Sequence, residues 1–411
     1  MMKRVVITGM GAITPLGANV DTTFERIINN ECGIKHITRF DTSEYKVSVA
    51  GEVESFDMTA YLSLREQKNN DSFVQYARVA AIQAMKQANF DLSKIDQTRM
   101  GVIIGSGIGG IGSIEKAKEN LTTLGPTRIS PYFIPMSLIN LAAGSVAIDQ
   151  QTKGVCSAVV TACAAGANAI GEAYLRIKYD DQDIMIAGGS EAAITPLAIG
   201  GFMVMRALST SDNPNSASTP FDKARSGFVM GEGAGILILE ELNHALSRNA
   251  TILGEIIGYG SSCDAFHITA PNENGEGAAL AMTLAMKQAG ISPLQIDYIN
   301  AHGTSTPLND KTEVIAIKQA FGDAANYPLI SSTKSHIGHL LGASGAVEAI
   351  ICLKALQEAV VPATINVNQL DEDCDLNILV NQAIKKEIHI AMSNSLGFGG
   401  HNASLIFRKW V

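Results

Sequence analysis

The sequence predicts an α/β fold built from two similar halves, and three observations support this prediction. Short β-branched strands alternate with helices rich in small residues along the whole chain. The 38 glycines suit many tight turns between such elements. Three strand-and-turn patterns of the first part recur in the second, although their residues are not identical. The pairs are 100–107 with 296–304, 157–175 with 329–348, and 183–189 with 387–400.

Composition narrows the class of protein. With 411 residues, 46% of them hydrophobic and 17% charged, the chain can bury a large core and contains no low-complexity tract. A net charge of −9 argues against a general nucleic-acid binder but leaves room for a local basic patch. No signal peptide or membrane span is expected. Six cysteines without CxxC or zinc spacing indicate a reduced protein of the cytoplasm.

The first half is expected to span residues 1–249. A strand at 4–7 ends at Gly9-Met10-Gly11, helices follow at 21–29 and 72–87, and a buried strand begins at Met100. Gly105, Gly107 and Gly110 match the GxGxxG pattern, but a clear dinucleotide-binding unit is missing around them. Close approach of the backbone to a neighbouring site is the favoured interpretation. A polar stretch at 209–226 is predicted to be a surface loop, followed by a strand at 233–239.

The second half is expected to span residues 250–411. Strands are predicted at 252–259, 296–300, 329–333 and 387–393, with a helix at 278–289 and another beginning near Gly342. Each half should therefore form a mostly parallel or mixed sheet between helices.

Cys163 lies where a short strand, 157–161, meets a helix of small residues. A thiol at a helix N-terminus meets free backbone N–H groups and the positive end of the helix dipole, which favour the thiolate. A cysteine among alanines is more often a packing residue, so the nucleophile interpretation needs partners elsewhere.

Such partners follow other predicted strands. His302, Lys334 and His339 stand at strand ends, where open α/β sheets gather their sites. No Asn or Asp stands out to orient a protease-type base. Two neutral imidazoles donating N–H to one oxygen would instead stabilise an enolate or oxyanion.

Four segments together resemble the β-ketoacyl-[acyl carrier protein] synthase family of condensing enzymes, over essentially the whole chain. They are 160–169 around Cys163, 300–306 around His302, 334–343 from Lys334 through His339, and 394–400 around Phe398. The synthase II group is the most similar and synthase I is the alternative. The resemblance implies the thiolase-like fold, five layers αβαβα, in a homodimer.

The resemblance also implies roles for five residues. Cys163 would carry the acyl chain as a thioester, and His302 and His339 would hold the malonyl thioester carbonyl during loss of CO₂. Lys334, paired with Glu348, would order the histidines. Phe398 would gate the site, and its N–H, with that of Cys163, would hold the oxyanion. The reaction needs no redox cofactor and no catalytic metal.

Other residues are carried over as binding sets. Thr269, Thr304 and Thr306 would contact the phosphopantetheine arm of the acyl carrier protein. The acyl tunnel would be lined by Ile108, Ala162, Ala193, Phe202 and Leu341, with Phe133 and Ile134 of the partner subunit. A patch for the acidic carrier protein would comprise Arg65, Lys68, Arg128 and Arg206. Some relatives hold a structural monovalent cation where this chain has Asn300, Ala301, Glu348, Ser393 and Asn394.

The chain departs from many relatives at His401 and Asn69, where threonine and a basic residue are common. Asn69 could weaken one contact with the carrier protein. A non-catalytic partner subunit would lack the nucleophile, and a thiolase would carry a second cysteine near the carboxyl end. A cysteine hydrolase stays open as another class.

The nucleophile can be tested directly by intact mass. After incubation with acyl-acyl carrier protein, we expect one acyl adduct on the wild type and none on Cys163→Ala. A folded wild type without an adduct would contradict the prediction and favour a partner subunit or binding protein.

Overall fold

Ten strands form one continuous hydrogen-bonded sheet that runs through both halves of the molecule, and its two five-stranded parts repeat one topology. The computed structural model describes residues 2–411. The strand order is β10-β9-β13-β14-β8-β1-β7-β6-β4-β5. The first-half strands are β1 (Val5–Ile13), β4 (Met100–Gly105), β5 (Cys156–Val159), β6 (Ile184–Glu191) and β7 (Gly233–Glu241). Their counterparts are β8 (Gly254–Cys263), β9 (Tyr298–Asn300), β10 (Leu329–Ser331), β13 (Ile390–Gly397) and β14 (His401–Arg408).

Strand directions confirm the duplication. In the first half β4 runs parallel to both neighbours, β5 and β6, while β7 is antiparallel to β6 and β1. In the second half β9 runs parallel to β10 and β13, while β14 is antiparallel to β13 and β8. The halves join through the antiparallel pair β1 and β8, over Val5–Ile7 and Gly254–Ile256.

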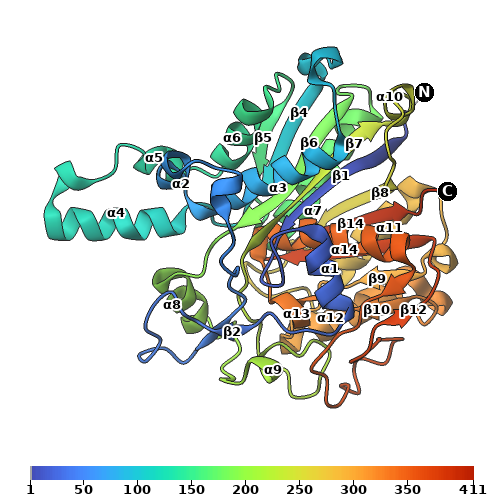
Figure 1. Cartoon of the computed structure of the whole chain (residues 1–411). Helices are drawn as coiled ribbons and strands as arrows, with labels where there is room; N and C mark the ends of the chain where they lie inside the picture. Colours follow the sequence, from blue (N-terminus) through green and yellow to red (C-terminus); the bar gives the residue numbers. More distant parts are fainter. Residues whose placement is uncertain (1) are drawn as a thin grey trace.

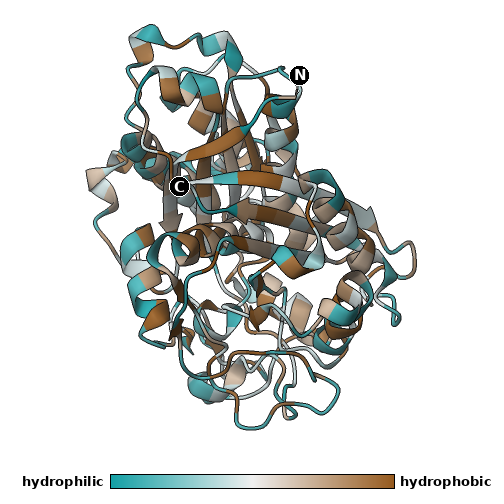
Figure 2. Ribbon diagram, turned by 90° about the vertical axis from the view of Figure 1, so that its right-hand side faces the viewer, coloured by the Kyte–Doolittle hydropathy of each residue, from teal (hydrophilic) through white to brown (hydrophobic). Residues whose placement is uncertain are grey.

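Helices complete five layers, as expected (Figure 1). On the outer face of the first half lie α3 (Ser72–Ala88) and α6 (Leu141–Gln150), which share an apolar core with β4, β6 and β7. Between the halves lie α7 (Ala165–Lys178) and α14 (Ser344–Glu358). Outside the second half lie α11 (Glu276–Ala289) and α12 (Pro307–Phe321). Figure 2 shows apolar strands inside and hydrophilic segments on the outer helices.

The remaining elements are short or peripheral. Figure 1 shows α4 (Ile111–Leu124) and α5 (Phe133–Ser137) extending from the body on one side. The other helices are α1 (Val20–Ile28), α2 (Leu64–Asn69), α8 (Pro196–Val204), α9 (Pro214–Ala217), α10 (Leu242–Ser247) and α13 (Lys334–Ile337). Two small ribbons are formed by β2 (Lys35–His36) with β3 (Val49–Ala50), and by β11 (Val360–Val361) with β12 (Ile384–Lys385). Among residues 2–411, no helix combines the length and apolarity needed to cross a bilayer.

Two predictions about local structure are wrong. The first strand does not end at Gly9-Met10-Gly11 but continues to Ile13, because these glycines let α3 lie against the strand. A Cβ on Gly11 would stand 1.9 Å from the carbonyl oxygen of Ala80.

The polar stretch 209–226 is not a surface loop throughout. Phe221, Asp222 and Arg225 are buried, and Arg225 donates to backbone carbonyls and pairs with Asp371 of the second half.

Close packing of α7 against α14 predicts a large effect of one methyl group. A Cβ on Gly345 would lie 2.6 Å from Ser395 Oγ and 2.8 Å from Ala167 Cβ. We expect Gly345→Ala to lower the free energy of unfolding by about 1–3 kcal/mol, measured by denaturant titration, despite the better helix propensity of alanine. Gly201 in α8 has no atom within 4 Å of its would-be Cβ. As the matched control, Gly201→Ala should leave stability unchanged or raise it by up to about 1 kcal/mol. Equal effects of the two substitutions would contradict the packing argument.

Candidate active site

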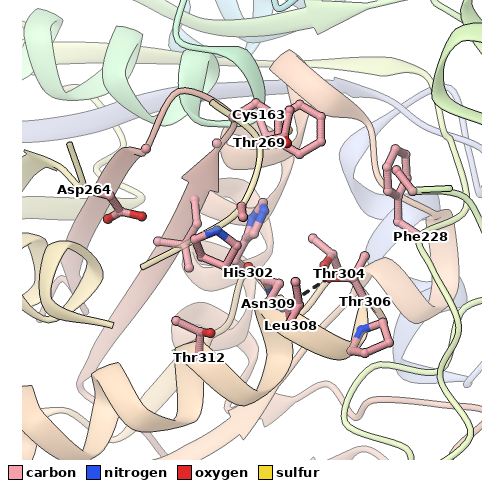
Figure 3. Close-up of a pocket in the computed structure, with 18 of the residues that line it drawn as sticks. Cys163, Phe228, Asp264, Thr269, His302, Thr304, Thr306, Leu308, Asn309 and Thr312 are labelled. Atoms are coloured by element: carbon pink, nitrogen blue, oxygen red, sulfur yellow. Dashed lines mark hydrogen bonds between the residues drawn. The ribbon is translucent and has the colours of Figure 1, made fainter. Parts of the chain in front are cut away.

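A cavity of about 420 Å³ opens where the two halves meet (Figure 3). The first half contributes Cys163, Phe202 and Arg206 to its wall, and the second contributes His302, His339 and Phe398 among others. In Figure 3, Cys163 and His302 lie around the same space although they come from opposite halves. The structure therefore brings together at one cavity Cys163, His302 and His339, which the sequence analysis assigns to one site.

Cys163 lies in a single 3-10 turn, η5 (Ala162–Ala164), between β5 and the start of α7. The preceding residue, Ala162, has φ +48°, a left-handed conformation that is costly for a residue with a Cβ. The second half repeats this turn as η8 (Leu341–Ala343), where Leu341 also has φ +48° and Gly342 occupies the central position. The duplicated turn thus carries a thiol in one half only.

The environment of the thiol corrects the expectation that it favours the thiolate. Burial raises the pKa of Cys163 to about 11, since a thiolate would lose its hydration. Lys334 and the N–H groups of Phe398 and Cys163 itself act in the opposite direction, but they do not overcome the burial. The sulfur is therefore a thiol at neutral pH, with two backbone donors directed at it.

His302 and His339 lie together and are both buried. Their ring centroids are 5.2 Å apart and their planes are nearly perpendicular, at 86°. Burial, and then the nearby charge of Lys334, lowers the pKa of both imidazoles well below the usual 6.5. Each ring is thus neutral at pH 7 and carries one N–H. Within residues 2–411, His302 Nδ1 and His339 Nε2 have no hydrogen-bond partner.

Lys334 begins α13, two residues before His336, and its side chain is 1% exposed. Its Nζ pairs with Glu348 of α14, so the structure contains the expected ion pair. His339 Nδ1 lies 2.8 Å from Ser344 Oγ at the start of the same helix. A hydroxyl donating to Nδ1 would leave the proton of the neutral ring on Nε2, the atom without a partner.

The sequence analysis missed two buried carboxylates. Glu313 of α12 accepts the backbone N–H groups of His302 and Gly303, both at 2.8 Å, and burial raises its pKa to about 7. Glu191, the last residue of β6, accepts from the glycine-rich loop after β4 and from Gly342. The only sequence signal for either was an acidic residue in an otherwise apolar or helical pattern, which is not specific.

The three threonines assigned to the pantetheine arm all line the cavity, and the hydroxyls of Thr304 and Thr306 are 2.9 Å apart. The tunnel residues Ala193 and Leu341 form one apolar cluster with Phe202 and Ile108, and Cys163 packs against it. Ala162 lies beside this cluster, next to Gly107. Phe133 and Ile134 lie on α5, outside the cavity of this chain, and Ile134 is exposed.

The four basic residues are all exposed, and none forms a salt bridge with another of residues 2–411. Arg206 lies at the cavity wall. Arg65 and Lys68 share α2, and Arg128 follows α4 in a short 3-10 turn, so these three lie on elements away from the cavity lining.

The residues assigned to a cation include three oxygens that suit one. Asn300 Oδ1, Glu348 Oε2 and Ser393 Oγ are buried without a hydrogen-bond partner among residues 2–411. Asn300 and Ser393 face each other across β9 and β13. The side-chain oxygen of Asn394 is already used, since it accepts from Ser404.

Comparison with known proteins identifies the family. Residues 2–245 match the model "Beta-ketoacyl synthase, N-terminal domain", and residues 253–368 match "Beta-ketoacyl synthase, C-terminal domain". The chain belongs to the β-ketoacyl synthase family. It is 51% identical over 408 residues to the 3-oxoacyl-[acyl-carrier-protein] synthase 2 of Staphylococcus aureus strain COL, covering 99% of each chain. It is 49% identical over 409 residues to the synthase 2 of Synechocystis, covering 99% of this chain and 98% of that one.

Solved structures agree with this family assignment. A β-ketoacyl synthase from Burkholderia phymatum has a TM-score of 0.92 and 34% identity, and each chain is covered completely. The ketosynthase complex AntDE:AntF, which holds a type II polyketide acyl-carrier protein, has a TM-score of 0.93 and 35% identity over the whole of both chains. The thiolase-like fold of a β-ketoacyl synthase is thereby confirmed, and the synthase I alternative is not favoured.

The neutral histidines predict a pH-dependent stability. An imidazole with a lowered pKa binds fewer protons in the folded protein than in the unfolded chain. Its stabilising contribution is therefore complete above the usual pKa of 6.5 and is lost as the pH falls below it. Relative to His339→Asn, the wild type should lose about 1.4 kcal/mol of unfolding free energy in total between about pH 7.5 and 5.5, with a slope that steepens as the pH falls.

Denaturant titrations over about pH 5.5 to 7.5 give this difference. The variant serves as the reference because Glu313, with its raised pKa, changes stability in the opposite direction in both proteins. A difference that does not vary with pH would contradict the lowered pKa of His339.

Proposed function

We propose that this chain catalyses the decarboxylative Claisen condensation of an acyl group with a malonyl group, both carried on acyl carrier protein, in fatty acid elongation. The observation that carries the proposal is one cavity holding a cysteine and two neutral, buried histidines. The full-length similarity to synthases named for 3-oxoacyl-[acyl-carrier-protein] supports it. The product is 3-oxoacyl-acyl carrier protein with release of CO₂.

The first step loads Cys163. The sulfur attacks the acyl thioester, a new C–S bond forms, and the bond to the pantetheine sulfur breaks. The proton of the Cys163 thiol ends on the departing pantetheine thiol. The raised pKa of Cys163 makes transfer of that proton part of the step. The N–H groups of Cys163 and Phe398, which already face the sulfur, are the donors best placed for the oxyanion.

The second step makes the nucleophilic carbon. The malonyl thioester carbonyl oxygen accepts hydrogen bonds from the N–H groups of His302 and His339. The C–C bond to the malonyl carboxylate breaks, CO₂ leaves, and the electron pair of that bond forms the enolate. Neutral imidazoles are suited to this role because each keeps one N–H to donate. Lys334 acts through its charge and its pair with Glu348, which keep the histidines neutral and ordered.

The third step joins the two carbons. The enolate carbon attacks the acyl-Cys163 carbonyl, a C–C bond forms, and the Cys163 C–S bond breaks. The sulfur leaves as a thiolate and takes a proton from water, which restores the Cys163 thiol. Phe398 would gate the site between the steps: its ring lies 6.3 Å from that of Phe202, and Gly399 and Gly400, which follow it, have φ values of +85° and +74°.

The substrates would arrive on the phosphopantetheine arm. Thr269, Thr304 and Thr306 in the cavity wall suit the amides and hydroxyl of that arm. The exposed and unpaired Arg65, Lys68, Arg128 and Arg206 suit an acidic carrier protein. The complex of the similar AntDE:AntF ketosynthase with its acyl-carrier protein supports this partner.

Four further assignments belong to the same proposal. The chain forms a homodimer through the exposed edge strand β5, with the adjacent exposed Val160, and through the exposed apolar side chains of the α4–α5 extension, such as Ile134. Phe133 and Ile134 would complete the partner's tunnel. Its halves are residues 1–249 and 250–411, and it acts in the cytoplasm.

A monovalent cation binds the buried oxygens of Asn300, Glu348 and Ser393, supported by Ala301 and Asn394.

The division of labour can be tested by uncoupling the steps. Cys163→Ala should abolish condensation but keep measurable decarboxylation of malonyl-acyl carrier protein. His302→Ala or His339→Ala should lower decarboxylation roughly 100-fold, the usual cost of losing one oxyanion donor. The exposed His389 gives the control, and His389→Ala should change neither rate. Equal loss of both reactions in folded Cys163→Ala would contradict the proposal, and release of free acid from the acylated wild type would favour a hydrolase.

A further inference from the structure

Glu191 holds together the segments that meet at the apolar cluster packed against Cys163. Its side chain is completely buried and accepts five hydrogen bonds. Oε1 accepts from Ser106 Oγ at 2.8 Å and from the N–H groups of Ile108 and Gly109, both at 3.1 Å. Oε2 accepts from Gly107 N–H at 2.6 Å and Gly342 N–H at 3.0 Å. One carboxylate therefore binds a loop of the first half to a turn of the second.

The segments bound by Glu191 carry the wall of the expected tunnel. Ile108 is itself a donor, Leu341 precedes the donor Gly342, and Ala193 follows Glu191 by two residues. Ala193 and Leu341 belong to one apolar cluster, against which Ile108, Phe202 and Cys163 pack. The backbones in between are in tight contact, since a Cβ on Gly342 would stand 2.3 Å from Gly107 N. A shift of the carboxylate would therefore move the wall on both sides.

Two facts argue against a chemical role for this carboxylate. Its charge raises the pKa of Cys163 and so disfavours the thiolate. All of its acceptor positions within the structure are taken by four backbone N–H groups and one hydroxyl, which leaves no free lone pair directed at the cavity. Five converging donors suit a group that only accepts, as an ionised carboxylate does.

We propose that Glu191 is a positioning residue that sets the width of the acyl tunnel, and thereby the range of acyl chain lengths that the enzyme accepts. The inference rests on the proposed condensing function and extends it to substrate selection. It assigns the GxGxxG-like loop a purpose: its N–H groups bind a carboxylate of the protein itself rather than a dinucleotide phosphate.

Glu191→Gln is the sharpest test because it keeps size and shape. In either orientation the new amide group directs its N–H toward at least two backbone donors, so the loop 106–109 or Gly342 must move away. We expect kcat/KM for loading long acyl chains to fall roughly tenfold, chiefly through KM, while loading of short chains changes little. Malonyl decarboxylation should stay within about twofold of the wild type, because the histidines are untouched.

A matched control separates positioning from general stability. Glu240 is a fully buried carboxylate at the opposite end of the β6–β7 ladder, bonded to Thr8, His244 and Arg248. Glu240→Gln should lower stability without altering the chain-length profile. If Glu191→Gln lowers loading of all chain lengths and decarboxylation equally, or keeps the wild-type profile, the proposal is overturned.

Two additional measurements keep the test decisive. Amide hydrogen exchange at Gly107, Ile108, Gly109 and Gly342 should accelerate in Glu191→Gln and not in Glu240→Gln, whatever the activity. If Glu191→Gln does not fold, Ser106→Ala removes one donor and should shift the profile in the same direction by roughly threefold. An unchanged profile there would also overturn the proposal. A wild type that neither loads acyl chains nor decarboxylates malonyl would instead refute the proposed function.

Discussion

The cavity depends on buried carboxylates that accept backbone N–H groups. Chain segments leave the sheet at the ends of β4 and β9, where their N–H groups lose strand partners and are partly or fully shielded from water. Glu191 accepts these groups after β4, and Glu313 accepts those of His302 and Gly303 after β9. Leaving such donors unpaired would cost about 1–3 kcal/mol each, so the acidic residues are needed wherever the loops are buried.

Duplication supplied two copies of one turn, and the halves use them differently. The turn before α7 holds Cys163, while the turn before α14 holds Gly342 and leaves room for the loop of the other half. The histidines come from the second half alone. Because β1 and β8 join the halves edge to edge and α7 packs against α14, the thiol and both imidazoles face one cavity.

Burial acts on the reacting groups in opposite ways. It keeps His302 and His339 neutral and thus able to donate, and the charge of Lys334 acts in the same direction. The same burial raises the pKa of Cys163, with only Lys334 and two backbone N–H groups opposing it. A dry cavity therefore suits an enolate, which needs donors, better than it suits a resting thiolate.

The sequence by itself determined the repeated α/β pattern, the positions of Cys163 and His302 just after strands, and the family, because these depend on local periodicity and on short contiguous segments. The prediction that His339 ends a strand is wrong, since the short helix α13 stands between β10 and His339. It could not reveal that β1 continues past Gly11 or that 217–222 and Arg225 are buried, since both depend on partners distant in the chain. It also placed the thiol correctly but not its pKa, which burial in the assembled cavity decides. Glu191 and Glu313 became visible only in the tertiary structure, because an acidic residue becomes informative when its hydrogen-bond donors, here up to 151 residues away, are known.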